Sequence, residues 1–203
     1  MQSDGYPTNW NQYSSYVFHS GSEQFGFMCG APDVNRFSAR FRAAACYRGV
    51  ILEGYSEATA QGYSALCRIL FTWSAFESFL KITNQKQVDM RNCFEQYGGI
   101  NVAASIKATD VDNIFYSFIY ERVNPAHKSE LDNYFNDDPC NIGYLASAIR
   151  HIFAHGWLTP NANQVDPRIA VSVCNQLCEF LILVMDSEFG KRISAGLEDL
   201  HSH

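Results

Sequence analysis

The residues whose types and spacing could do chemistry lie close together near position 150. Within residues 149–156, one arginine is followed by two histidines: Arg150, His151 and His155. On a helix, Arg150 and His155 would lie about 140° apart and about 7.5 Å along the axis, at the two edges of one polar face. Histidine transfers protons near neutral pH, and arginine binds anionic oxygens in pairs. Because Ser147 on the same face is small, a ligand or a second helix could approach these groups.

A helix over residues 139–155 is predicted to carry this segment. Asp138 followed by Pro139 is a favourable helix start, and Gly156 is a favourable residue just past a helix end. The same start signal, Asp166 followed by Pro167, opens a predicted helix over residues 167–187.

Most of the remaining chain also favours helices. Ser56 is a good cap for a long helix over 57–82, and the others are expected over 34–52 with Asp33 as cap, 86–97, 110–122 and 127–135. Residues 1–32 are rich in Tyr, Ser, Gly and Asn, which predicts irregular structure with short strands near residues 16–18 and 25–27. The predicted fold class is all-α: a helical bundle with an irregular, partly helical N-terminal extension.

Composition limits the classes of protein that fit. The chain has 203 residues, of which 47% are hydrophobic and 18% charged, and this composition argues against a disordered or fibrous protein. Its formal charge of −6 argues against coating nucleic acid through bulk positive charge. Seven scattered cysteines without a CxxC pair and the lack of a signal peptide favour a reducing cytoplasm. The most apolar run, residues 169–185, is interrupted by polar residues and short for a bilayer, so we expect a core helix and no membrane association.

An arginine, a polar residue and then a histidine after four intervening positions, on a late helix of an all-helical domain, resembles the signature of the HEPN superfamily. Here the motif spans residues 150–155, and the resemblance covers residues 56–187. It implies two regions, an extension over 1–55 and a HEPN-like bundle over 56–203. It also implies a metal-independent endoribonuclease that needs no cofactor and works as a homodimer, or a dimer of dimers, with both motif helices facing one cleft.

The resemblance also implies roles for single residues. His155 would be the principal acid and base, Arg150 would clamp the phosphate, and His151 would orient it. Some HEPN proteins carry an acidic residue on an earlier helix that supports the motif arginine, and Glu77 is the candidate for that position; Ser147 is a further supporting residue. The plainer interpretation of Glu77 is a surface pair with Lys81, four residues later.

Two other groups have competing interpretations. Arg36, Arg40 and Arg42 lie in a basic stretch that is either a solvated face or a track for an RNA backbone. Cys174 and Cys178, paired with His151 and His155, could build a zinc site, but their apolar neighbours favour burial in the core, and no metal is predicted.

The first functional hypothesis is therefore a HEPN-type ribonuclease with RNA as its ligand, acting as a toxin or defence component with an antitoxin protein as a further partner. A second is a catalytically inactive bundle of the same kind that binds a nucleotide or a partner. A third is a structural dimer in which the motif pairs helices. If RNA is the substrate, the charge of −6 confines its contact to one small cleft.

Overall fold

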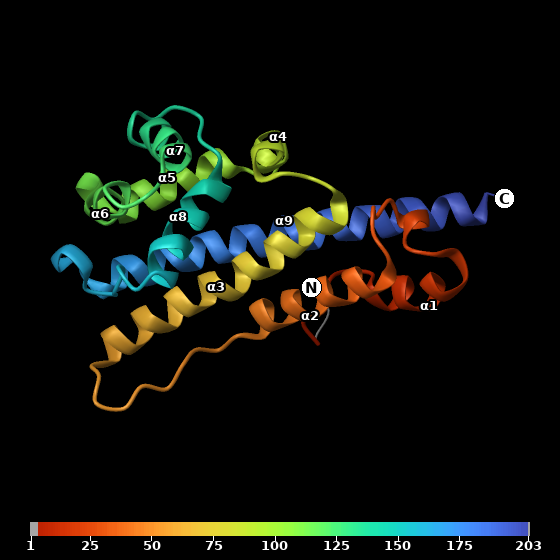
Figure 1. Cartoon of the computed structure of the whole chain (residues 1–203), viewed down its shortest axis with the longest axis horizontal. Helices are drawn as coiled ribbons and strands as arrows, with labels where there is room; N and C mark the ends of the chain where they lie inside the picture. Colours follow the sequence, from red (N-terminus) through yellow and green to blue (C-terminus); the bar gives the residue numbers. More distant parts are fainter. Residues whose placement is uncertain (1–3, 203) are drawn as a thin grey trace.

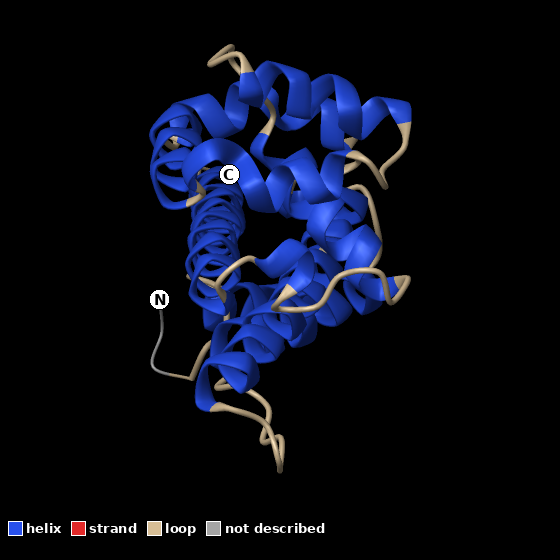
Figure 2. Ribbon diagram, turned by 90° about the vertical axis from the view of Figure 1, so that its left-hand side faces the viewer, coloured by secondary structure: helices blue, strands red, loops and turns tan. Residues whose placement is uncertain are grey.

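The computed structural model describes residues 4–202, and over this range the chain forms α-helices and no strand (Figure 1, Figure 2). This confirms the all-α prediction. The helices are α1 (Trp10–Ser20), α2 (Ala31–Cys46), α3 (Glu57–Thr83), α4 (Arg91–Gln96), α5 (Gly99–Thr109), α6 (Ile114–Tyr120), α7 (Pro125–Phe135), α8 (Ile142–Ala154) and α9 (Pro167–His201).

The two longest helices, α3 and α9, form the centre of the molecule and run in the same direction (Figure 1). Gly62 of α3 lies against Pro167, the first residue of α9, and Arg68 one and a half turns later donates to Asn175 at 2.9 Å. Both helices start as predicted: the side chain of Ser56 accepts from the backbone of Thr59, and that of Asp166 accepts from the backbone of Arg168.

The N-terminal region differs from the prediction. Residues 10–20, expected to be irregular with a strand near 16–18, form α1. Residues 23–25 form a 3-10 turn, and the second strand expected near 25–27 is not formed. The reason is tertiary packing, because Tyr13 and Val17 are buried one turn apart on α1. Helix α2 begins at Gly30 as cap, before the expected Asp33, and packs antiparallel to α3. Its Asp33 instead pairs with Lys81 at 2.9 Å.

Short helices cover the other side of the α3–α9 pair (Figure 1). The region from 86 to 122 was predicted as two helices, whereas it holds three helices, α4, α5 and α6, and two 3-10 turns, Gln87–Met90 and Val111–Asn113. A helix break does fall at Gly98, whose φ of 81° lies between the end of α4 and the start of α5 at Gly99, and the added element is α5 itself. The carboxylate of Asp110, fully buried, accepts from the backbone of Phe115 and Tyr116 and thereby fixes the start of α6.

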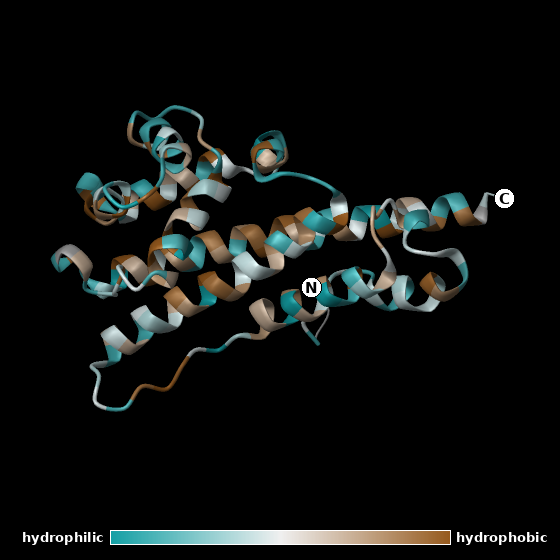
Figure 3. Ribbon diagram, in the orientation of Figure 1, coloured by the Kyte–Doolittle hydropathy of each residue, from teal (hydrophilic) through white to brown (hydrophobic). Residues whose placement is uncertain are grey.

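Apolar residues line the facing sides of α3, α8 and α9, and polar residues face outward (Figure 3). Helix α9 extends to residue 201, well beyond the predicted end at 187, so it is not too short for a bilayer. By length and composition alone it could cross a membrane, but 56% of its most apolar stretch is buried inside the protein. That burial is typical of the core helix of a globular domain.

Candidate functional site

The motif segment lies at the C-terminal end of α8. The helix starts at Asn141 as cap, and the predicted Asp138–Pro139 start is wrong, because Asn141 is held by two distant groups: Glu130 accepts from its backbone at 2.8 Å, and the carbonyl of Gln87 accepts from its side chain at 2.9 Å. The helix ends at Ala154, one residue before the predicted end.

Gly156 takes a left-handed conformation at φ 77°, as a terminating glycine should. The backbone of Gly156 donates to Phe153 and that of Trp157 donates to Ile152, both at 3.0 Å, which closes the helix with the double hydrogen bond typical of a glycine C-terminus. As the residue between the helix and this glycine, His155 is exposed to solvent.

Arg150 reaches from α8 to α3. Its Nη2 donates to Glu77 Oε1 at 3.4 Å, and the two side chains are 37% and 50% exposed. The structure therefore brings the proposed supporting acid and the motif arginine together, while Lys81, the alternative partner of Glu77, pairs with Asp33. An exposed pair of this length adds little stability, so its effect is to orient the guanidinium.

Three histidine rings form a row that leads from the surface into the protein. His155 is exposed and its ring centroid lies 4.6 Å from that of His151, which is half-buried. His151 in turn stacks on the buried His127 at 6.0 Å. Burial lowers the pKa of His151, and the neighbouring His155 and Arg150 lower that pKa further. The imidazole of His151 is therefore neutral near pH 7 and can accept a proton.

His127 is held by Asn124 and Ser147. The Asn124 side-chain oxygen accepts from the backbone of His127 at 3.1 Å and lies 2.9 Å from its Nδ1, while Ser147 Oγ lies 2.9 Å from its Nε2. An oxygen that accepts at Nδ1 assigns the proton of the neutral ring to Nδ1, so Nε2 accepts from the Ser147 hydroxyl. Burial and the nearby His151 lower the pKa of His127, which favours this neutral form.

Ser147 thus differs from its expected place. It was predicted on an open surface, but α7 covers it and only 8% of it is exposed. The sequence did not predict His127 or Asn124 at the site. Their signal is weak, since Asn124 followed by Pro125 predicts a helix start but not its contact with α8.

An exposed aromatic side chain extends the site. Trp157, 56% exposed, has its ring 5.9 Å from that of His155. It borders a hollow of about 510 Å³ whose other wall is α6 and the turn that follows, with Arg122 stacked on Phe118 at 3.7 Å. The motif histidine therefore lies beside a shallow surface that carries a flat ring and a guanidinium, the latter paired with Glu121 at 3.2 Å.

The arginines of α2 do not gather into one track. Arg36 pairs with Asp33, Arg40 donates to Ser78 of α3, and Arg42 donates to the backbone oxygen of Asp4 at 3.0 Å. On the helix, Arg42 lies about 240° from Arg36, on a different face. Arg40 and Arg42 hold α2 against other parts of the chain, whereas Arg36 is paired within α2 itself.

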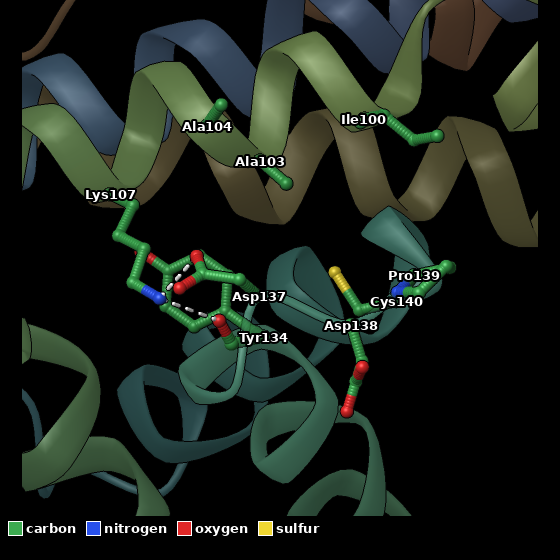
Figure 4. A pocket seen from close by; sticks show the side chains of 9 residues that line it. All are labelled: Ile100, Ala103, Ala104, Lys107, Tyr134, Asp137, Asp138, Pro139 and Cys140. Carbon is green, nitrogen blue, oxygen red and sulfur yellow. Dashed lines mark hydrogen bonds and ion pairs between the residues drawn. The ribbon is translucent and has the colours of Figure 1, made fainter.

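Another hollow, of about 270 Å³, lies between α5 and the turn after α7 (Figure 4). Lys107 donates there to the carbonyls of Tyr134 and Phe135 and to the carboxylate of Asp137, so its three protons close the end of α7. Burial raises the pKa of the Cys140 thiol to about 11, so this thiol is protonated and weakly nucleophilic at neutral pH.

The zinc alternative has no geometric support. Cys174 and Cys178 are buried in the core, and within the described residues no three His, Cys, Asp or Glu side chains gather as a metal site would require.

No protein-family model matches this chain, and no curated protein and no solved structure matches it. The resemblance to the HEPN superfamily therefore depends on the motif of residues 150–155 and on its place in a helical bundle.

Proposed function

We propose that this chain is a metal-independent endoribonuclease of the HEPN type, with a composite site formed where two copies meet. The observation that carries the proposal is the grouping of Arg150, His151 and His155 at the accessible end of α8, with Glu77 in contact with the arginine. The proposal places the protein in the cytoplasm as a toxin or defence component that an antitoxin protein binds.

These groups suit RNA cleavage by the substrate's own 2′-hydroxyl. A neutral histidine takes the 2′-hydroxyl proton, the 2′-oxygen bonds to phosphorus, the bond from phosphorus to the 5′-oxygen breaks, and a protonated histidine gives its proton to that leaving oxygen. The products are a 2′,3′-cyclic phosphate and a 5′-hydroxyl. Arg150 stabilises the negative charge that builds on the non-bridging oxygens.

One copy of the site offers few groups for this work. Two histidines must lie on opposite sides of the scissile phosphate, and His151 and His155 of one chain are adjacent. A two-fold dimer supplies the second set without new residues. The half-buried Phe153 within the motif and the exposed Trp157 just after it are apolar surface that such a contact would cover.

The test is cleavage of single-stranded RNA by the purified protein in EDTA. We expect His155→Ala to lower the rate by about 10²–10⁴-fold, with Arg150→Ala lowering it similarly. His19→Ala is the matched control, because His19 is an exposed histidine on α1. Products ending in 2′,3′-cyclic phosphate would support the proposal.

Failure would take distinct forms. A folded protein that cleaves no RNA, and whose expression affects cells equally with or without His155, would contradict the ribonuclease. Tight nucleotide binding without cleavage would favour the inactive binding bundle instead. If Arg150→Ala dissociates a dimer, as sedimentation would detect, the motif serves helix pairing.

A further inference from the structure

A polar hollow distant in sequence from the motif lies between α3, α9 and the loop after α2. Its volume is about 450 Å³, and Figure 1 shows this loop running alongside the first half of α3. We call it the arginine pocket and define it by its polar lining: Arg48, Gln61, Ser64, Arg68 and Asn175. Ser64 fixes the loop, because its hydroxyl accepts from the backbone of Val50 at 3.0 Å.

Arg68 lines this pocket, and its hydrogen-bonding capacity is only partly used. Its Nη1 donates to Asn175 at 2.9 Å and lies 3.7 Å from Glu179 Oε1, whereas its Nε is buried and has no hydrogen-bond partner among the described residues. A buried N–H without an acceptor is unfavourable. The edge of a guanidinium that contains Nε is one that binds two oxygens of a phosphate or carboxylate. Because Nε is closed to solvent, a ligand in the pocket would meet the outer nitrogens of Arg68, of which Nη1 already binds Asn175 and lies near Glu179.

Arg48 supplies a second cation. It is exposed at the mouth of the pocket and forms no hydrogen bond or ion pair with the residues that the structure describes. No carboxylate pairs with Arg48: Glu57 accepts from the neutral amide of Gln61 at 3.0 Å, and Glu179, 70% exposed, lies 3.7 Å from Nη1 of Arg68. The charge of Arg48 is left without a counter-ion in a protein of net charge −6.

We propose that the arginine pocket binds a small phosphate monoester, with its dianionic phosphate between Arg48 and Arg68. A phosphate dianion matches two guanidinium groups in charge, and Gln61 provides a further donor. Tyr47, Gly49, Ala65 and Val171 complete the lining, and they give the organic part of the ligand a mostly apolar surface. A volume of about 450 Å³ suits a ligand of nucleoside-monophosphate size. This proposal is independent of the ribonuclease activity.

The experiment is calorimetric titration of the full chain with AMP and, separately, with inorganic phosphate. Both are expected to bind, and Arg48→Gln or Arg68→Gln should weaken AMP binding about tenfold each. Asn175→Asp is the sharper variant, because it keeps the acceptor for Arg68 while placing a negative charge at the pocket, and it should weaken AMP binding by at least as much. Arg36→Gln makes the same charge change away from the pocket and should leave the affinity unchanged.

The outcomes separate clearly once circular dichroism shows that each variant is folded. Lack of binding of both AMP and phosphate at millimolar concentration would overturn the proposal, as would equal weakening by Arg36→Gln. If Arg48 and Arg68 are needed for binding a single-stranded oligoribonucleotide while AMP does not bind, the pocket serves a polynucleotide backbone and the small-molecule proposal is wrong.

Discussion

Replacing Ser147 with alanine removes one oxygen atom from the contact between α7 and α8. In the native protein that oxygen lies 2.9 Å from His127 Nε2, and both side chains are 8% exposed. The variant leaves the Nε2 lone pair of His127 buried without a donor, because water has little access to this site. His127 itself stays in place, since Asn124 still binds its other ring nitrogen.

The size of the effect follows from two opposing terms. An orphaned buried acceptor costs about 1–3 kcal/mol, while alanine in place of serine inside a helix returns about 0.5 kcal/mol. We therefore expect Ser147→Ala to lower the free energy of unfolding by about 1.5 kcal/mol. For a chain of this length, that corresponds to a loss of about 3–6 °C in Tm.

Urea denaturation followed by circular dichroism measures this change. Ser105→Ala is the control, because Ser105 is exposed on α5 and its replacement should be neutral or slightly stabilising. If Ser147→Ala were as stable as Ser105→Ala, the hydrogen bond between His127 and Ser147 would contribute nothing, and the buried neutral state assigned to His127 would be refuted.

Three further changes test other contacts. Gly62→Ala should destabilise by about 1–3 kcal/mol, because its Cβ would lie 2.5 Å from Pro160 Cβ, whereas Gly190→Ala, with its nearest atom at 3.3 Å, should be tolerated; thermal unfolding compares them. Because the pKa of His127 is lowered in the folded protein, the unfolded chain binds more protons in acid. The free energy of unfolding should therefore fall as pH drops below about 6.5, by at most about 1.4 kcal/mol per pH unit. His127→Gln should reduce this pH dependence, as measured by urea denaturation at several pH values. Asp110→Ala should cost about 2 kcal/mol in the same urea assay, since it orphans two backbone N–H groups at the start of α6, and an unchanged midpoint would contradict that role.

The start of a helix could be predicted from sequence where the capping residue binds backbone close to it in the chain. Ser56 and Asp166 each bind the backbone two or three residues ahead, so the starts of α3 and α9 could be predicted from sequence. The same signal failed at Asp138, because Asn141 is fixed as the cap by Glu130 and Gln87 from other elements. The local sequence does not show which of two suitable capping residues is held by hydrogen bonds from other helices.

Helix α1 could not be predicted from sequence, because it depends on packing against distant residues. Its tyrosines, serines and asparagine have modest helix propensity, and the segment is helical because Tyr13 packs between Phe25 and Phe189, with ring centroids 5.4 and 5.9 Å away. Phe189 is more than 170 residues away in the chain, so a local pattern could not predict this burial.

Some residues of the candidate site could likewise be predicted from sequence, and others depend on tertiary packing. Arg150, His151 and His155 lie within six residues, so about one and a half turns of a single helix place them on one face without tertiary information. Glu77 was predicted through a family resemblance, and its contact with Arg150 spans 73 positions. His127 needed the packing of α7 on α8, and no spacing rule links it to Ser147, 20 residues later.

The distribution of positive charge then limits how RNA could be held. Arg36 and Arg40 are engaged within the protein, and near the motif the charges of Arg150 and Arg122 are partly balanced by Glu77 and Glu121. Binding to RNA would thus neutralise about two to four phosphates even in a dimer, and the logarithm of affinity should fall with the logarithm of salt with a slope of about −1.5 to −3 for a single strand. Filter binding at several salt concentrations measures this slope, preferably with the His155→Ala variant so that the RNA stays intact. A slope near −7 would require a broad basic surface, and the confinement of RNA to the end of α8 would then be wrong.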